Sequence, residues 1–250
     1  MQASTVVGYA GADLTECDQG ISAGACFIPV SGDTIDLGDI KVVGNEGALD
    51  SEVEAQTLDE YGGTDRSYYW MDTVSPATGA KFYGWYYEDE PYADLDDDDK
   101  VFLAPGEGLF VQIYTEEPVK LQSSGEVPTK EDIATGLAAC DEGKLIVNPS
   151  PIDVDLGNCK ISGYGDAKTD SEIEVQTLDV WGGTDKSYYW MDTVSPATGA
   201  KFYGWYYEDE PYDDLSEEDK LTIKPGNGVF VQTYGDWEFE FVWPKVVIAK

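Results

Sequence analysis

The sequence predicts an all-β protein made of two tandem, similar β-sandwich or barrel-like domains. Three observations lead to this prediction: an internal duplication with an offset of 120 residues, apolar residues that alternate with a period of two, and frequent turn signals. Turn residues recur about every 8–12 positions, which is typical of β-sandwiches and barrels. We therefore expect about eight short strands in each copy.

The duplication defines the two domains. A 26-residue segment is identical at Ser67–Tyr92 and Ser187–Tyr212, and 46 of 62 positions match between Val53–Tyr114 and Ile173–Tyr234. A period of this length is too long for a solenoid repeat and fits two whole domains. We place the first domain at residues 1–124 and the second at residues 125–250, with a short link around Ser123–Pro128.

Period-two patterns and turn residues predict the individual strands. In Trp237–Trp243 the apolar residues alternate with polar ones, so Trp237, Phe239, Phe241 and Trp243 should share one face. Pro105–Gly108 and Pro225–Gly228 are turns that need positive φ, and Val74–Gly79 is a longer hairpin loop. The other predicted strands of the first copy lie near Cys26–Val30, Ile40–Val43, Val53–Leu58, Ser67–Asp72, Ala80–Tyr87, Lys100–Leu103 and Gly108–Tyr114.

Helix is expected to be scarce. Asp94–Lys100, Asp214–Lys220 and Lys130–Ala139 are each predicted to hold one or two helical turns. Hydrophobic content of 42% and aromatic content of 13% are high enough to build cores in both copies despite the charge.

The charge and the composition exclude several functions. The chain has 50 acidic against 15 basic residues, no histidine and a net charge of −35. Such a surface repels phosphate backbones and anionic membranes, so we expect no nucleic-acid partner. Without histidine there is no Ser-His-Asp triad and no imidazole zinc site, so catalysis would need carboxylates, Tyr, Lys or Cys.

The expected location is outside the cell. No apolar run approaches the roughly 18–20 residues of a membrane span, so we expect no direct membrane insertion. Met1–Thr5 lacks the basic start and apolar region of a signal peptide, so we expect a mature secreted or cell-surface chain from which the signal peptide is missing.

Several motifs give the chain a family resemblance. They are Asn148-Pro149-Ser150-Pro151, the Tyr-Tyr-Trp hairpin, Gly84-Trp85-Tyr86 and the Pro-Gly-x-Gly turn that precedes a Phe-Val strand. With them, the chain resembles the tandem all-β modules of uncharacterised secreted and surface proteins of Verrucomicrobia and related gut bacteria. The resemblance covers nearly the whole chain and implies an all-β fold and an extracellular location. It implies no catalytic residue.

The cysteines are Cys17, Cys26, Cys140 and Cys159, two in each copy. Proximity in sequence favours the disulfides Cys17–Cys26 and Cys140–Cys159, which suit an oxidising compartment. The alternative is buried free thiols, above all at Cys159, which stands where the first copy has Ile40.

Aromatic residues in the repeated hairpin form one candidate binding site. Tyr and Trp beside carboxylates suit sugar binding, because the rings stack on the sugar and the acids take its hydroxyls. The same rings are also ordinary core material, or they form an interface between copies. The candidate ligand-binding residues are Tyr68, Trp70, Trp85, Tyr87, Tyr188, Trp190, Trp205 and Tyr207.

Acidic loops form a second candidate site. Clustered carboxylates are what Ca²⁺ needs, although the spacing is not that of an EF-hand, and a solvated loop is the alternative. The candidate ligands for weak Ca²⁺ binding are Asp94, Asp96, Asp98, Asp214 and Glu218. We expect no other cofactor.

Enzyme activity is disfavoured. Asp72-Thr73 and Asp192-Thr193 occur once per copy as in aspartic proteases, but Val74 and Val194 replace the glycine that those enzymes need. No local motif selects a glycosidase carboxylate pair. We expect a non-enzymatic structural or adhesin-like protein with glycans or other surface proteins as partners. The alternatives are a carbohydrate-binding module and a carboxylate-dependent hydrolase.

Overall fold

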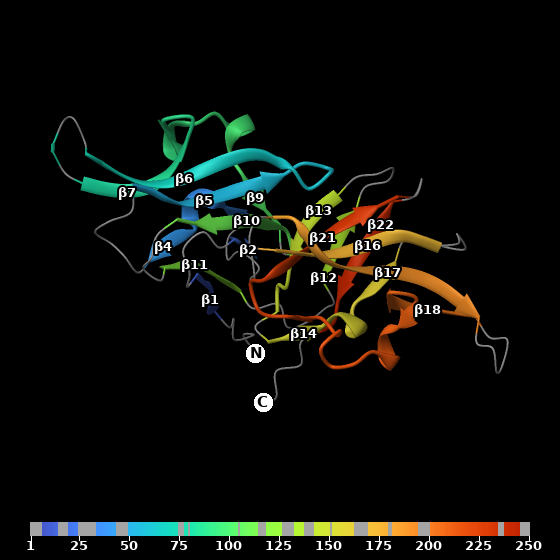
Figure 1. Ribbon diagram of the computed structural model, residues 1–250. Helices are drawn as coiled ribbons and strands as arrows, with labels where there is room; N and C mark the ends of the chain where they lie inside the picture. Colours follow the sequence, from blue (N-terminus) through green and yellow to red (C-terminus); the bar gives the residue numbers. More distant parts are fainter. Residues whose placement is uncertain are drawn as a thin grey trace, which may run out of the picture.

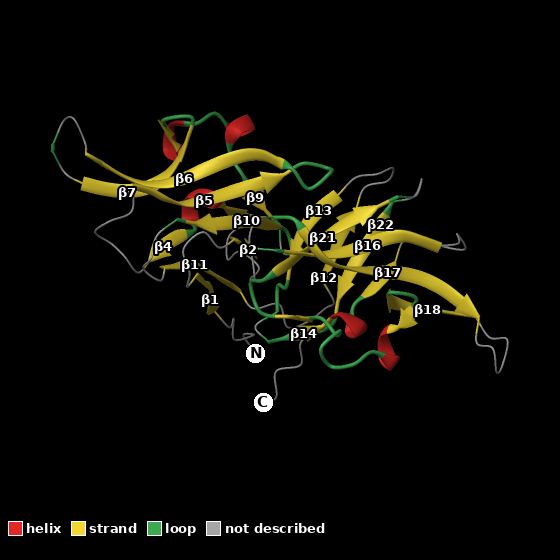
Figure 2. Ribbon diagram, in the orientation of Figure 1, coloured by secondary structure: helices red, strands yellow, loops and turns green. Residues whose placement is uncertain are grey.

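The computed structural model consists of β-strands and short 3₁₀ helices, with no α-helix among the residues that it describes. The predicted all-β class is therefore confirmed (Figure 1; Figure 2). The described residues are 7–14, 20–24, 34–43, 50–74, 78–79, 81–104, 106–114, 119–126, 133–137, 143–150, 152–162, 170–179, 182–194, 201–234 and 238–245.

The described residues of the first half form three sheets. A three-stranded sheet has the order β1-β11-β4, a six-stranded sheet has the order β2-β10-β5-β6-β7-β8, and β3 pairs with β9. The strands are β1 (Val7–Leu14), β2 (Gly20–Gly24), β3 (Ile35–Asp36), β4 (Lys41–Val43), β5 (Asp50–Leu58), β6 (Thr64–Val74), β7 (Lys81–Tyr87), β8 (Glu90–Pro91), β9 (Phe102–Leu103), β10 (Gly108–Ile113) and β11 (Val119–Glu126). The 3₁₀ helices are η1 (Leu37–Asp39), η2 (Tyr92–Asp94) and η3 (Asp97–Asp99).

The second half has sheets of the orders β12-β22-β15, β13-β21-β16-β17-β18-β19 and β14-β20. In Figure 1 these yellow to red strands gather beside the blue to green strands of the first half. They are β12 (Ile133–Leu137), β13 (Gly143–Val147), β14 (Val154–Asp155), β15 (Lys160–Ser162), β16 (Asp170–Leu178), β17 (Thr184–Val194), β18 (Lys201–Tyr207), β19 (Glu210–Pro211), β20 (Thr222–Ile223), β21 (Gly228–Thr233) and β22 (Phe239–Trp243). The 3₁₀ helices are η4 (Leu156–Asn158) and η5 (Tyr212–Asp214).

Each half buries apolar residues of its three-stranded sheet against those of its six-stranded sheet. In the first half Val42 and Leu121 share a core with Val53, Trp85 and Val111. In the second half the alternation predicted for β22 is confirmed, because Phe239, Phe241 and Trp243 are buried and Glu240 is exposed. Trp237 lies outside the described residues.

The turn predictions agree with the backbone, whereas one helix prediction is wrong. Gly106 and Gly226 have φ values of 90° and 75°, as the predicted turns require, and Val74 pairs with Lys81 across the predicted hairpin. Within Lys130–Ala139, however, the described residues form strand β12, which pairs with β22. Pairing with a strand more than 100 residues away decides the conformation of this segment, and a short sequence window does not contain that information.

The two halves meet through a small apolar junction, which we define as Leu58, Phe110, Leu145, Leu178 and Phe230. Polar contacts join the same elements: the amide of Val147 donates to the carbonyl of Gly106 (2.9 Å), and Lys144 pairs with Glu107. A side chain at Gly143 would collide with the Phe230 ring and with the carbonyl oxygen of Glu60 in the first half. The close approach at this junction therefore depends on a glycine.

None of the helices among the described residues is long and apolar enough to cross a membrane. The predicted strand at Cys26–Val30 lies outside the described residues. The predicted link is partly strand, since Ser123 and Ser124 continue β11, which pairs with β1 up to Glu126.

Candidate functional site

Some of the aromatic side chains of the repeated hairpin face the core. Tyr68, Trp70 and Trp85 are buried, as are their counterparts Tyr188, Trp190 and Trp205. Tyr87 and Tyr207 are half-buried and pack on Tyr68 and Tyr188, with ring centroids 5.2 Å apart in both pairs. The six rings are core residues in this structure, although Trp85, Trp190 and Trp205 also line the grooves described below. Sugar binding by these residues stays a prediction.

The polar atoms of these rings hold backbone segments in place. The indole N–H of Trp85 donates to the carbonyl of Ile40 (2.8 Å), and that of Trp205 donates to the carbonyl of Cys159 (3.0 Å). The hydroxyl of Tyr68 donates to the carbonyl of Asp99, and that of Tyr188 donates to the carbonyl of Asp219, both at 2.7 Å. Each hairpin therefore anchors the acidic loop of its own half.

Cations from the hairpin neutralise part of each acidic loop. Arg66 donates to the carbonyl of Asp98 (2.7 Å) and lies 3.5 Å from the Asp99 carboxylate. Lys186 donates in the same way to the carbonyl of Glu218 (2.9 Å). Burial raises the pKa of Tyr188 to about 12, with the Tyr207 hydroxyl and the Asp219 carboxylate adding to the effect. The pKa of Tyr68 is also raised by burial, but a hydrogen bond and the positive charge of Arg66 oppose that increase.

The predicted calcium ligands lie on the exposed surface of these loops. Among the described residues, no group of three or more acidic, Cys or His side chains converges as a metal site would require. Asp94 lies at the end of η2, Asp96 and Asp98 lie at η3, and Asp214 and Glu218 occupy the equivalent loop of the second half. Weak calcium binding stays a prediction.

Of the predicted disulfide cysteines, Cys17, Cys26 and Cys140 lie outside the described residues. Cys159 is a free, fully buried thiol in the core of the second half, so its predicted disulfide with Cys140 is not formed in this structure. Cys159 packs in the core at the position that Ile40 takes in the first copy, as the alternative of a buried free thiol predicted. Burial raises the pKa of this thiol well above its ordinary value, which makes the reactive thiolate scarce.

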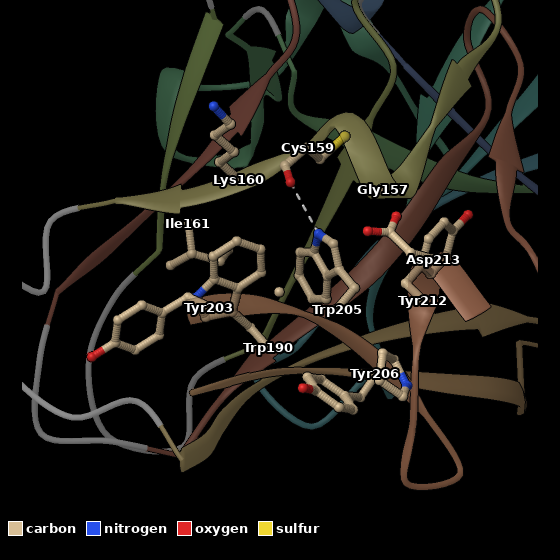
Figure 3. Close-up of a pocket in the computed structure, with 12 residues that line it drawn as sticks. Gly157, Cys159, Lys160, Ile161, Trp190, Tyr203, Trp205, Tyr206, Tyr212 and Asp213 are labelled. Carbon is tan, nitrogen blue, oxygen red and sulfur yellow. Dashed lines mark hydrogen bonds between the residues drawn. The ribbon is translucent and has the colours of Figure 1, made fainter. Parts of the chain in front are cut away.

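A groove recurs in the two halves, and sequence reasoning missed it. In the second half it lies between β18 on one side and η4 with β15 on the other, with a cavity volume of about 350 Å³ (Figure 3). The first half has a groove of about 360 Å³ between β7 and η1 with β4. The positions shared by both grooves are Gly38/Gly157, Lys41/Lys160, Tyr83/Tyr203, Gly84/Gly204, Trp85/Trp205, Tyr86/Tyr206, Pro91/Pro211, Tyr92/Tyr212 and Ala93/Asp213.

The groove of the second half combines aromatic walls with polar groups. Figure 3 shows Trp205 at its centre, with its indole bonded to the carbonyl of Cys159, and the Asp213 carboxylate beside Tyr212. Tyr203 is 37% exposed at the other end, and Lys160 points away from the aromatic residues. An exposed aromatic ring and a carboxylate at the ends of a groove with both polar and apolar walls suit a small polar ligand.

Each half also buries a carboxylate that the sequence did not single out. Glu54 accepts a hydrogen bond from the hydroxyl of Tyr114 at 2.6 Å, and Glu174 accepts one from Tyr189 at 3.2 Å and another from Tyr234. Burial raises the pKa of Glu54, but hydrogen bonds from Ser67 and Tyr114 outweigh it and hold the pKa below its ordinary value. In the alternating sequence of these strands, Glu54 and Glu174 are expected to face solvent. Their burial can therefore be recognised only from the fold.

No protein-family model, no curated protein and no solved structure matches this chain.

Proposed function

We propose that this chain is a non-enzymatic, secreted or cell-surface protein of two tandem β-sandwich domains with a structural or adhesin-like role. The tandem organisation is supported by the identical 26-residue segments and by equivalent strand orders in the two halves. The observation that carries the role is the use of the aromatic hairpins. Their rings fill two cores and anchor two loops, as expected of a stable scaffold.

The junction supports a scaffold role as well. Phe110 and Phe230 are almost fully buried there, so the two domains share apolar surface as well as a linker. The small apolar contact, together with the hydrogen bond between Val147 and Gly106 and the ion pair between Lys144 and Glu107, favours one arrangement of the two domains over free movement about the linker.

This role is tested by locating the protein in its own cells. Antibody detection after fractionation should find it in the medium or at the surface, where added protease removes it from intact cells. Detection only in the cytoplasm would overturn the proposal. Small-angle scattering of the purified chain should fit one rigid particle, and a Phe110→Ala/Phe230→Ala variant should broaden the distribution of shapes.

The recurring groove favours a second candidate function, the binding of neutral glycans. A tyrosine ring stands at the same place in both grooves, and Asp39 or Asp213 provides a carboxylate. Two copies of one site on one chain would increase avidity for a repeating polysaccharide.

A glycan array tests this second candidate. Binding should be lost in a Tyr83→Ala/Tyr203→Ala variant and kept in Tyr61→Ala, which removes a 71% exposed ring outside both grooves. Equal glycan binding by all three chains would reject the grooves as the site.

A further inference from the structure

A small pocket lies on the opposite face of the second half's six-stranded sheet from Trp190 and Trp205. Its volume is about 220 Å³, and its walls are Tyr189, Met191, Tyr206, Glu208 and Asp209. Tyr189 and Tyr206 are direct partners across β17 and β18, so their side chains share this face. The volume is below the roughly 300–1,000 Å³ of a typical ligand cleft, so the pocket suits a single chemical group.

The rim of the pocket is negatively charged. Glu208 and Asp209 form the turn between β18 and β19, are exposed, and have φ values of 48° and 69°. Neither carboxylate forms an ion pair or a hydrogen bond with another residue that the structure describes. Both carboxylates are therefore available to a cation from solution.

The walls suit a cation that carries methyl groups. Aromatic faces attract quaternary ammonium groups, and the thioether of Met191 offers a polarisable contact. Tyr206 is only 6% exposed, and its hydroxyl has no hydrogen-bond partner in the described part of the chain. The hydroxyl of Tyr189 is held by the buried Glu174 at 3.2 Å, which fixes the ring and adds negative charge behind it.

We propose that this pocket binds an organic cation of the quaternary ammonium type, such as the trimethylammonium group of choline. Two carboxylates attract the charge, while two tyrosines and a methionine contact the methyl groups. A hard metal ion fits less well, because Ca²⁺ takes about six to eight oxygen ligands and the pocket brings two carboxylates. The overall charge of −35 also favours a cationic ligand over an anionic one.

The first half carries the same residues at the same spacing. Tyr69, Met71, Tyr86, Glu88 and Asp89 lie within the identical 26-residue segment. Tyr69 pairs with Tyr86, the Tyr86 hydroxyl is also buried without a partner among described residues, and Glu88 and Asp89 have φ values of 47° and 71°. We therefore expect a second, equivalent site in each chain.

Calorimetric titration of the intact chain with choline at low ionic strength tests the proposal. Choline should bind at two sites per chain. Its neutral isostere 3,3-dimethyl-1-butanol should bind at least about tenfold more weakly, since the charge is lost and the shape is kept. Phosphocholine should also bind more weakly than choline, because its negative phosphate would lie near the carboxylates of the rim. If phosphocholine binds as tightly as choline, the assignment of the rim to these carboxylates is wrong.

Matched variants separate the pocket from the general negative charge. Glu88→Gln, Asp89→Asn, Glu208→Gln and Asp209→Asn together should weaken choline binding by about tenfold or more. Glu60→Gln, Asp153→Asn, Glu217→Gln and Glu238→Gln remove the same charge from other exposed positions and should change the affinity by about twofold or less, because exposed distant charges are screened. Equal effects of the two quadruple variants, or an isostere that binds as well as choline, would overturn the proposal. Thermal melting confirms that each variant is folded.

Discussion

The two halves differ least in the aromatic hairpin and more in the segments that the hairpin side chains contact through the backbone. The hairpin Ser67–Tyr92 is repeated without a change in Ser187–Tyr212. Its tryptophan donates to the carbonyl of Ile40 in one half and of Cys159 in the other. A carbonyl is present whatever the side chain, so the same geometry accepts either residue. The comparison teaches that side-chain to backbone bonds let loops diverge around an unchanged hairpin.

The acidic loops show the same effect. Tyr92 both donates to and accepts from the backbone of Val101, and Tyr212 does so with Leu221. Arg66 and Lys186, which differ in shape, both donate to a loop carbonyl. Loop sequence has changed while the anchoring tyrosine and the cation have kept their roles.

The largest effect is expected at the repeated tryptophan. Trp85→Ala and Trp205→Ala should each lower the free energy of unfolding by about 3–5 kcal/mol, because each removes a buried ring and leaves a carbonyl unpaired. Urea unfolding measures both. The two variants should lose a similar amount of unfolding free energy. If only one of them is destabilised, the two tryptophans do not have equivalent roles.

The junction should show the next largest effect. Gly143→Ala places a methyl group against Phe230 and the backbone of Glu60, which should cost about 1–3 kcal/mol through overpacking. Gly136→Ala is the matched control, because a methyl group there meets no atom within 4 Å. Equal stability of the two variants would show that the halves do not approach each other as closely as described.

Cys159 tests the position at which the cores differ. Cys159→Ser should lower the free energy of unfolding by about 1–3 kcal/mol by burying a hydroxyl, and Cys159→Ile, the larger residue of the first half, should cost about 1–3 kcal/mol by overpacking the core. The thiol should react with Ellman's reagent only after unfolding, since it is buried and its pKa is raised. Rapid reaction of Cys159 in the folded protein would contradict its place in the core.

A titration to alkaline pH compares the effects of Arg66 and Lys186 on the pKa of the neighbouring tyrosine. The pKa of Tyr188 is raised from 10.0 to about 12, so its contribution to stability is complete below pH 10 and is lost as the pH rises toward 12. Lys186→Arg should lower the pKa of Tyr188, because in the first half the hydrogen bond from Arg66 opposes the effect of burial. Tyrosinate absorbance during a pH titration measures the change, and an unchanged titration curve would reject the role of Arg66.

The smallest effect is expected at the strained turns. Replacing Glu88-Asp89 or Glu208-Asp209 by Asn-Gly should stabilise either half by about 1 kcal/mol, because Asn and Gly adopt positive φ at lower cost. Thermal melting records the gain. A loss of stability would mean that the acidic side chains make contacts that offset the strain.

Much of the fold could be predicted from sequence, because turn glycines and alternating residues act locally. Phe239, Phe241 and Trp243 are an example, since their spacing alone places them on one face. The strand at Ile133–Leu137 could not be predicted, because β22 determines it from far along the chain. The site was harder to predict. Aromatic residues on both faces of the hairpin do not reveal which face is covered, and the groove joins Trp205 to Cys159, 46 residues away.

The solvent exposure of the hairpin tryptophans tests the central claim that these rings form two cores. Trp181 and Trp237 lie outside the described residues, so a Trp181→Phe/Trp237→Phe chain keeps only tryptophans that the structure buries. The fluorescence of this chain should be blue-shifted and resist quenching by acrylamide until the protein unfolds. Red-shifted, readily quenched emission from the folded chain would place the rings at the surface and contradict the account.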